Sequence, residues 1–145
     1  METLTLTNMC MVTNEDGKVL MQKHGGNWPG WCFPGGHIEK NEPFFSAVIR
    51  EVYEETGLTI ESPMLCGVKQ FFRRNGERYI VLLYQTDTYT GQLRSSPEGE
   101  VCWMPVERLY QQELAPGFEE MLPVFLQGHI QEVFYLPDMD TPTYY

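Results

Sequence analysis

Residues 36–58 of the chain read GHIEKNEPFFSAVIREVYEETGL, and this stretch carries the strongest structural pattern in the sequence. From residue 43 to residue 56 apolar and charged residues recur with helical spacing, and Pro43 suits a first helical turn. Gly57 is typical of a helix end, because glycine takes the left-handed conformation there without strain. The stretch therefore predicts a glycine-containing loop that leads into a helix over 43–56.

Three glutamates lie near the end of this helix. Glu51, Glu54 and Glu55 have the spacing i, i+3 and i+4, so their carboxylates share one face. Like charges at these spacings repel by about 0.2–0.5 kcal/mol per pair. The helix dipole disfavours an anion near the C-terminal end by a further ~0.3–1 kcal/mol. Arg50 offsets part of this cost if it pairs with Glu54, four residues later.

Two interpretations of the acidic face are open. It is either an ordinary solvated surface or a site at which a bound cation offsets the repulsion. Carboxylate oxygens are the ligands that Mg²⁺ and Mn²⁺ prefer, and no cluster of His or Cys accompanies them to favour zinc. Apolar residues on a neighbouring face are expected to enter the core, namely Phe45, Val48, Ile49 and Val52.

The residues around the glutamates favour the second interpretation. Gly36 is followed after five residues by Glu42, and after seven more by the run RE-V-Y-EE-T-G-L, residues 50–58. This resembles the Nudix box, G-x5-E-x7-R-E-U-x-E-E-x-G-U, in which U is a bulky aliphatic residue, and every specified position matches. We therefore expect a member of the Nudix hydrolase family, which cleaves a nucleoside diphosphate linked to another group.

The resemblance implies a fold and a set of roles. The fold is of the α+β class, an α/β/α sandwich around a mixed β-sheet, formed by a single domain over residues 1–145 with an irregular tail at 136–145. The metals, Mg²⁺ or alternatively Mn²⁺, would be bound by Glu51, Glu54 and Glu55 with help from the Gly35 carbonyl. Arg50 and Glu42 would hold the loop and the helix together.

The general base has two candidates. One is Glu51, and the other is a glutamate on the loop before Trp103, as in some relatives of the resembled family. Glu98 and Glu100 both precede this tryptophan, and Glu98 is preferred because it lies further into the loop. The alternative is that both are solvated loop charges.

The segment WCFPGG, residues 31–36, looks like the W-x-F-P-G-G segment of MutT-type enzymes. The whole chain is similar to bacterial 8-oxo-dGTP diphosphatases, whose products are 8-oxo-dGMP and pyrophosphate. MutT enzymes read the oxidised base with an asparagine on a late loop. This chain has no asparagine after Asn75, so another group would do so here.

Candidate substrate-binding residues flank the glycine loop. Trp28, Trp31 and Phe33 are able to stack on a purine, with core packing as the alternative, favoured for Phe33. Lys23 and His24 end a strand beside the loop and are candidates for phosphate contacts, or else ordinary surface residues.

Other functions remain possible at this point. One is hydrolysis of a nucleotide sugar, ADP-ribose, a dinucleotide or an RNA 5′ end. Another is a Nudix-like sensor that binds a nucleotide without cleaving it, although such modules usually lose the glutamates of the box and this chain has them all.

The composition limits the kinds of partner that the protein is expected to bind. The formal net charge of −10 disfavours a nucleic-acid polymer as partner, since such surfaces need clustered Lys and Arg. No apolar run reaches the roughly 20 residues of a membrane span, and the N-terminus does not look like a signal peptide, so a cytoplasmic enzyme is expected. The four cysteines match no zinc pattern and are expected to be free, buried thiols.

The rest of the chain is expected to be rich in strands. We expect them at 3–13, 19–23, 31–33, 64–73, 78–88 and 101–104, with helices at 106–112 and 117–127. Aromatic residues near the end either mark a dimer contact or fold back on the core, so a monomer and a homodimer both remain open: Phe134, Tyr135, Tyr144 and Tyr145.

Overall fold

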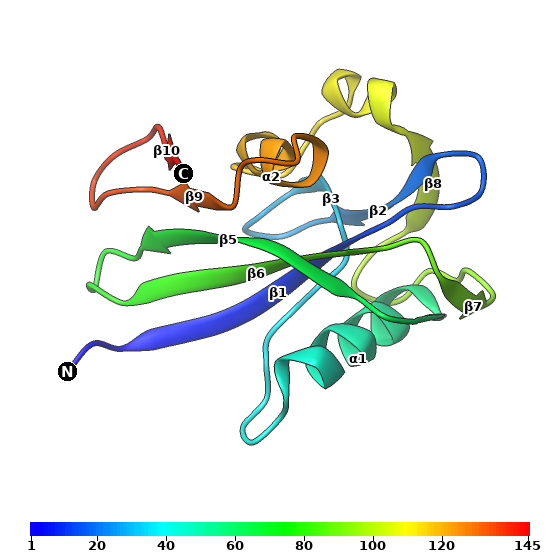
Figure 1. Ribbon diagram of the computed structural model, residues 1–145, viewed down its shortest axis with the longest axis horizontal. Helices are drawn as coiled ribbons and strands as arrows, with labels where there is room; N and C mark the ends of the chain where they lie inside the picture. Colours follow the sequence, from blue (N-terminus) through cyan, green and yellow to red (C-terminus); the bar gives the residue numbers. More distant parts are fainter.

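The computed structural model describes every residue from Met1 to Tyr145 and contains a five-stranded mixed sheet (Figure 1). The strand order is β1-β6-β5-β9-β10. Strands β1 and β6 run parallel to each other, as do β5 and β9, whereas the β5–β6 and β9–β10 pairs are antiparallel. The strands are β1 (Leu4–Val12), β5 (Met64–Phe72), β6 (Arg78–Thr86), β9 (Glu132–Phe134) and β10 (Thr143–Tyr144).

Two smaller antiparallel sheets complete the β structure. One has the order β3-β2-β8 and the other pairs β4 with β7. Their strands are β2 (Lys18–His24), β3 (Gly30–Cys32), β4 (Leu58–Ile60), β7 (Tyr89–Gly91) and β8 (Val101–Pro105).

Helices lie on both sides of the large sheet. Figure 1 shows α1 (Phe44–Thr56) below it and α2 (Leu122–Leu126) above it. Two 3-10 helices, η1 (Val106–Gln111) and η2 (Glu119–Met121), precede α2 in the chain. This arrangement confirms the predicted α+β class and the α/β/α sandwich around a mixed sheet. No helix combines the length and the apolar character that crossing a membrane requires.

The core has two parts because alternate residues of β1 point to opposite faces of the sheet. Met9 and Met11 belong to a cluster that includes residues of η2 and α2. Cys10 and Val12 belong to a second cluster, with Val48 of α1. The sheet is thus covered on both faces, which fixes α1 under β1.

The helix prediction over 43–56 is confirmed to within one residue. Pro43 occupies the N-cap position without a side-chain cap, and Gly57 ends the helix with a φ of 81°. Val48 and Val52 are buried as expected. The expectation for Phe45 is wrong, since it is 53% exposed: it lies in the first turn, where its neighbour Phe44 is exposed as well.

The C-terminal third differs from the prediction. The helix expected at 106–112 is a 3-10 helix, and the one expected at 117–127 is divided into η2 and the short α2, with Pro123 in its first turn. The tail at 136–145 is not wholly irregular, because Thr143 and Tyr144 pair with β9. The short strands β4, β7, β9 and β10 have too few residues to show a period in the sequence.

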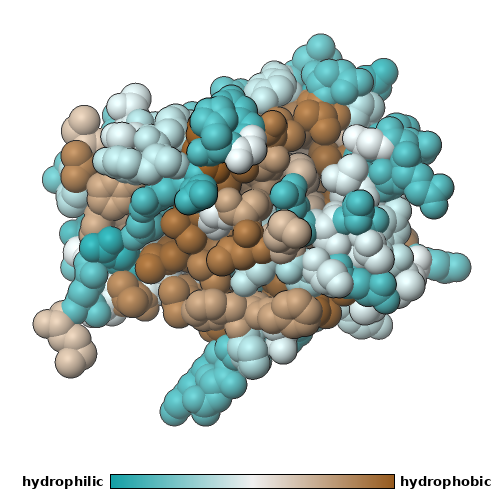
Figure 2. All heavy atoms as spheres, viewed as in Figure 1, coloured by the Kyte–Doolittle hydropathy of each residue, from teal (hydrophilic) through white to brown (hydrophobic).

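The cysteines are all free, as predicted. Cys10 and Cys32 are buried, whereas Cys66 and Cys102 are only partly buried, so the expectation of burial is correct for two of them. Figure 2 shows that apolar side chains also gather on the surface, in the middle of the face seen in Figure 1, with polar side chains around them.

The fold separates two phenylalanines that the sequence alone does not distinguish. Phe33 is 1% exposed, with its ring edge-on to Phe118 at 4.8 Å and to Phe125 at 5.0 Å between centroids. We predict that Phe33→Ala lowers the free energy of unfolding by about 3–5 kcal/mol, through lost packing and the cavity it leaves. Phe45→Ala, the matched control, should change it by no more than about 0.5 kcal/mol in the same denaturant titration. Equal losses in the two variants would contradict this description of the core.

Candidate active site

The glycine loop before α1 is held against strand β1 by backbone and side-chain hydrogen bonds. The Gly36 N–H donates to Asn8 Oδ1 at 3.0 Å, and the Asn8 N–H donates to the Gly36 carbonyl at 2.8 Å. A Cβ at Gly35 would lie 2.1 Å from the Asn8 carbonyl oxygen, and one at Gly36 would lie 2.3 Å from the carboxylate of Glu51. Gly35 therefore needs to be glycine because backbone lies against it, whereas a side chain at Gly36 would displace the Glu51 carboxylate.

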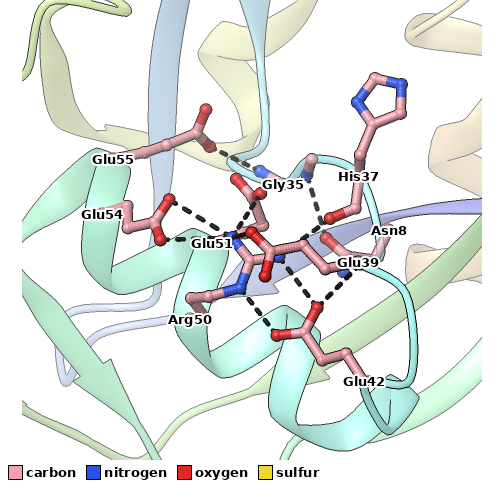
Figure 3. A network of polar contacts seen from close by, with 10 residues as sticks. Asn8, Gly35, His37, Glu39, Glu42, Arg50, Glu51, Glu54 and Glu55 are labelled. Atoms are coloured by element: carbon pink, nitrogen blue, oxygen red, sulfur yellow. Dashed lines mark hydrogen bonds and ion pairs between the residues drawn. The ribbon is translucent and has the colours of Figure 1, made fainter.

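Arg50 joins this loop to the helix (Figure 3). Its Nε donates to Glu42 Oε2 at 2.7 Å and its Nη2 donates to Glu42 Oε1 at 3.0 Å, a bidentate pair. Nη2 also donates to the His37 carbonyl at 3.0 Å. The guanidinium lowers the pKa of Glu42 to about 2, and Glu42 in turn raises the pKa of Arg50. The ion pair expected between residues 42 and 50 is present.

The same guanidinium reaches the acidic face of α1. Nη1 of Arg50 donates to Glu51 Oε1 at 2.9 Å and to Glu54 Oε1 at 3.2 Å. The expected i,i+4 pair between Arg50 and Glu54 is therefore present. With Glu39, whose Oε1 lies 3.6 Å from Nη1, the single positive charge of Arg50 pairs with four carboxylates, so the face remains acidic.

Burial increases along this face toward the cleft. The side chain of Glu54 is 55% exposed and that of Glu51 is 13% exposed, while Glu55 is 2% exposed as a residue. Glu55 Oε1 accepts a hydrogen bond from the Gly35 N–H at 2.8 Å. Burial raises the pKa of Glu51, and burial together with the neighbouring Glu98 raises the pKa of Glu55 well above its ordinary value. A buried carboxylate without a positive partner is costly unless a proton or a cation joins it.

Glu98 lies on the loop between β7 and β8, next to the acidic face of α1. Its carboxyl group lies within hydrogen-bonding reach of Glu55. Gly99 allows the loop to approach, since a Cβ there would lie 2.0 Å from the Lys23 carbonyl oxygen. Glu98 lines the same cleft as Glu51 and Glu55, whereas Glu100 does not.

The cleft has a volume of about 1370 Å³. Besides the three glutamates, His24 and Trp28 line it. Their rings meet edge-on at 5.6 Å, and Trp28 Nε1 donates to the Pro116 carbonyl at 2.8 Å. Burial lowers the pKa of His24, so the imidazole favours its neutral form. Trp28 and His24 are thus placed where the sequence predicted substrate-binding residues.

Of the other candidates, Lys23 and Trp31 lie outside the cleft, and Phe33 packs in the core, the alternative that the sequence favoured for it. Lys23 is exposed, with its ammonium 5.9 Å from the ring centroid of Trp31. Phe33 contributes to the cleft wall, but its ring faces are covered by the core, so it has no face free for a purine. Trp31 does not line the cleft either.

Of the predicted metal ligands, Gly35, Glu51 and Glu55 line the cleft whereas Glu54 does not, and the four do not converge on one point. No three acidic, His or Cys side chains are arranged around a common centre. The physical reason is that Arg50 takes up the carboxylates of Glu51 and Glu54, and the Gly35 N–H takes up that of Glu55. The oxygen-only donor set nevertheless fits a hard divalent cation, and the exposed Glu54 is free to turn toward one.

Several cleft residues were not predicted from the sequence. Asn8 lies in an otherwise apolar strand, and its Nδ2 is buried without a hydrogen-bond partner. Lys69 is a single charge within the strand β5 and is 7% exposed. A polar residue among the inward-pointing residues of a strand indicates a site. The sequence reveals it only when it is known which residues of that strand point inward.

Comparison with known proteins identifies the family. The NUDIX domain family matches residues 3–125. An uncharacterized Nudix hydrolase of Bacillus subtilis, YvcI, is 33% identical over 143 residues, which cover 93% of this chain and 89% of that protein. The crystal structure of a MutT protein from Bacillus halodurans superimposes with a TM-score of 0.73 at 25% identity, covering 97% of this chain and 96% of the other. The chain belongs to the Nudix family.

The relatives do not share one substrate. An ADP-ribose pyrophosphatase of Methanocaldococcus jannaschii is 30% identical over 61% of this chain and 54% of its own length. An oxidized purine nucleoside triphosphate hydrolase of Danio rerio is 31% identical over 66% of this chain and 63% of its own length. Family membership therefore indicates hydrolysis of a diphosphate bond in a nucleotide, but it does not identify the nucleotide.

The buried Glu55 generates a pH prediction. A folded-state pKa above the ordinary value of 4.5 means that the folded protein binds this proton more tightly than the unfolded chain. Stability should therefore fall as the pH rises above about 5 in protein freed of metal with EDTA. Glu55→Gln should remove part of this slope and raise the free energy of unfolding by about 1 kcal/mol or more at about pH 8. Thermal unfolding across the pH range measures it.

The matched control is Glu54→Gln, since Glu54 is on the same face but 55% exposed, and it should change the slope little. Mg²⁺ should stabilise the parent protein more than the Glu55→Gln variant. A pH profile that is the same in the parent and in Glu55→Gln would contradict the assignment of a strained buried carboxylate.

Proposed function

We propose that this Nudix protein is a Mg²⁺-dependent pyrophosphohydrolase that cleaves a purine nucleoside triphosphate, with 8-oxo-dGTP as its substrate, in the cytoplasm. The observation that carries the proposal is the meeting of Glu51, Glu55 and Glu98 in one cleft beside the two glycines of the loop. Three carboxylates in a half-closed cleft repel a phosphate chain unless a cation stands between them. The site therefore suits a cation together with an anionic substrate.

Mg²⁺, or Mn²⁺ in its place, would be held by Glu51, Glu54, Glu55 and the Gly35 carbonyl, where it would neutralise phosphate charge and lower the pKa of water. Arg50 positions this set, because it contacts Glu42, Glu51 and Glu54 at once. A small movement of Arg50 would shift the loop and the carboxylates together.

Glu98 is the better candidate for the general base. Glu51 is tied to Arg50 Nη1 at 2.9 Å, so its carboxylate is already engaged by a positive charge. Glu98 stands on a different element, the loop between β7 and β8, and it interacts with Glu55, which has no positively charged partner. In the proposed reaction Glu98 takes a proton from the attacking water, and the oxygen of this water forms a bond to phosphorus. The bond from phosphorus to the bridging oxygen breaks, and 8-oxo-dGMP and pyrophosphate are released.

Three observations support a purine nucleoside triphosphate over other nucleotides. The cleft contains Trp28 beside His24, which offers an aromatic surface for a base. Asn8 carries a buried Nδ2 without a partner at the cleft, an amide donor for a carbonyl oxygen of substrate. The Danio rerio relative acts on oxidized purine nucleoside triphosphates. ADP-ribose is the second candidate, because of the Methanocaldococcus jannaschii relative.

Replacement of the proposed base tests the mechanism. We predict that Glu98→Gln lowers kcat by about 10²–10⁴-fold, because removing a general base removes that share of the rate enhancement. Glu100→Gln is the matched control, two residues away and outside the cleft, and it should retain activity. Phosphate or pyrophosphate release with Mg²⁺ measures both. If Glu98→Gln were as active as Glu100→Gln, the base would lie elsewhere.

A substrate panel tests the assignment. With Mg²⁺ present, kcat/KM for 8-oxo-dGTP should exceed the values for dGTP and ADP-ribose by about tenfold or more, as expected for one additional discriminating hydrogen bond. Liquid chromatography of the products distinguishes release of pyrophosphate from release of phosphate. Equal cleavage of 8-oxo-dGTP and dGTP, or preference for ADP-ribose, would overturn the proposed substrate.

A further inference from the structure

Lys69 is a buried charge that the mechanism above does not use. It lies on β5, near the middle of the five-stranded sheet, and its side chain lines the cleft although the residue is only 7% exposed. Its ammonium forms no ion pair and no hydrogen bond, and burial lowers its pKa to about 8. An ammonium group has three donors and is costly to keep in such a place without acceptors.

Lys69 and its neighbours form a wall of the cleft that is different from the wall formed by the acidic face of α1. Its Nζ lies 5.4 Å from the ring centroid of Phe71 and 5.5 Å from that of Tyr135. It would lie 2.8 Å from a Cβ at Gly117, so the absence of a side chain there leaves room at the ammonium. Figure 1 shows α2 on the opposite side of the sheet from α1, while β9 is the strand that pairs with β5 beside Lys69.

Glu120 supplies an acceptor beside this donor. It lines the cleft, and its charge raises the pKa of Lys69 without a direct ion pair between them. Burial and Glu120 also raise the pKa of Tyr135 to about 12, so the tyrosine keeps its proton. Asp138 and Asp140 line the cleft as well. Arg73 and Arg74 line it too, so Lys69 and Glu120 stand among side chains of both signs, a setting that favours a neutral group carrying both an acceptor and donors.

We propose that Lys69 and Glu120 select a guanine-type base, with Lys69 donating to its 6-oxo oxygen and Glu120 accepting from its N1–H and 2-amino groups. Adenine presents an amino donor to Lys69 and an N1 acceptor to Glu120, so both contacts are mismatched. The rings of Phe71 and Tyr135 flank the base. The inference rests on the proposed function, because it assumes that the phosphates of the nucleotide lie at α1 while the base of the same nucleotide lies at this wall.

Guanine and 8-oxoguanine share the 6-oxo, N1–H and 2-amino groups, so this pair selects guanine over adenine and does not sense oxidation. A contact at another position, such as the Asn8 amide, would have to do that. The two kinds of selectivity are therefore separable by mutation.

The test compares kcat/KM for dGTP, 8-oxo-dGTP and dATP with Mg²⁺ in the parent protein and in Lys69→Met, whose side chain keeps the apolar stem and loses the charge. The parent should favour the guanine nucleotides by about tenfold or more, and Lys69→Met should bring the ratio close to one. Lys18→Met, at a lysine outside the cleft, should leave the ratio unchanged. An unchanged ratio in Lys69→Met, or a parent without guanine preference, would overturn the inference.

A second pair of variants tests the acceptor. Glu120→Gln should lower the guanine preference, whereas Glu119→Gln, its exposed neighbour, should not. Both should keep the thermal unfolding midpoint of the parent to within a few degrees, which separates loss of selectivity from loss of folding. Equal effects of the two variants on the ratio would contradict a direct contact by Glu120.

Binding without turnover separates this inference from the proposed function. Titration with GMP, AMP and inorganic pyrophosphate, followed by tryptophan fluorescence in the presence of EDTA, should show about tenfold tighter binding of GMP than of AMP, and Lys69→Met should abolish the difference. If the parent cleaved none of the triphosphates, the proposed function would fail while this ratio would still decide the role of Lys69. If Lys69→Met weakened pyrophosphate binding as much as GMP binding, Lys69 would be a phosphate ligand and the inference would be wrong.

Discussion

The guanidinium of Arg50 is the contact on which the geometry of the site depends. It is bonded in two places to Glu42 on the loop, to the His37 carbonyl, and to Glu51 and Glu54 on the helix. The loop and the helix therefore move as one unit. Because the same loop is also hydrogen-bonded to Asn8 of β1, the sheet, the glycines and the acidic face are fixed relative to one another.

This arrangement neutralises only part of the negative charge. Arg50 reaches the outer carboxylates, but Glu55 is buried behind them and meets another carboxyl group, that of Glu98. The fold thus maintains a local electrostatic cost in this cleft, where a cation bound with a phosphate chain would remove it. On another wall Lys69 and Glu120 form a donor and an acceptor that are not paired with each other. In the function that we propose, the two walls complement two parts of one nucleotide, a charged chain and a neutral base.

The sequence was sufficient for α1 and for the ion pairs of its acidic face, because both follow from short-range spacing: the Gly57 stop, the pairing of Arg50 with Glu54 and the position of Glu42. It was not sufficient where long-range packing decides. Phe33 and Trp31 have similar neighbours in the chain, yet only the fold shows that one is in the core and the other lies outside the cleft. Lys69 and Glu120 are 51 residues apart (120 − 69) and come together only through the packing of η2 against the sheet. Strands of two or three residues such as β10 depend on their partner and leave no periodic pattern.

The central claim is that the acidic end of α1 binds a divalent cation when a nucleotide is present. Crystals soaked with Mn²⁺ and a nucleoside monophosphate, measured at a wavelength where manganese scatters anomalously, test it most directly. The account predicts an anomalous peak within coordination distance of carboxylate oxygens from Glu51, Glu54 and Glu55, with Glu54 turned away from Arg50. An anomalous map without a peak at these carboxylates, from crystals in which the nucleotide is bound, would contradict it.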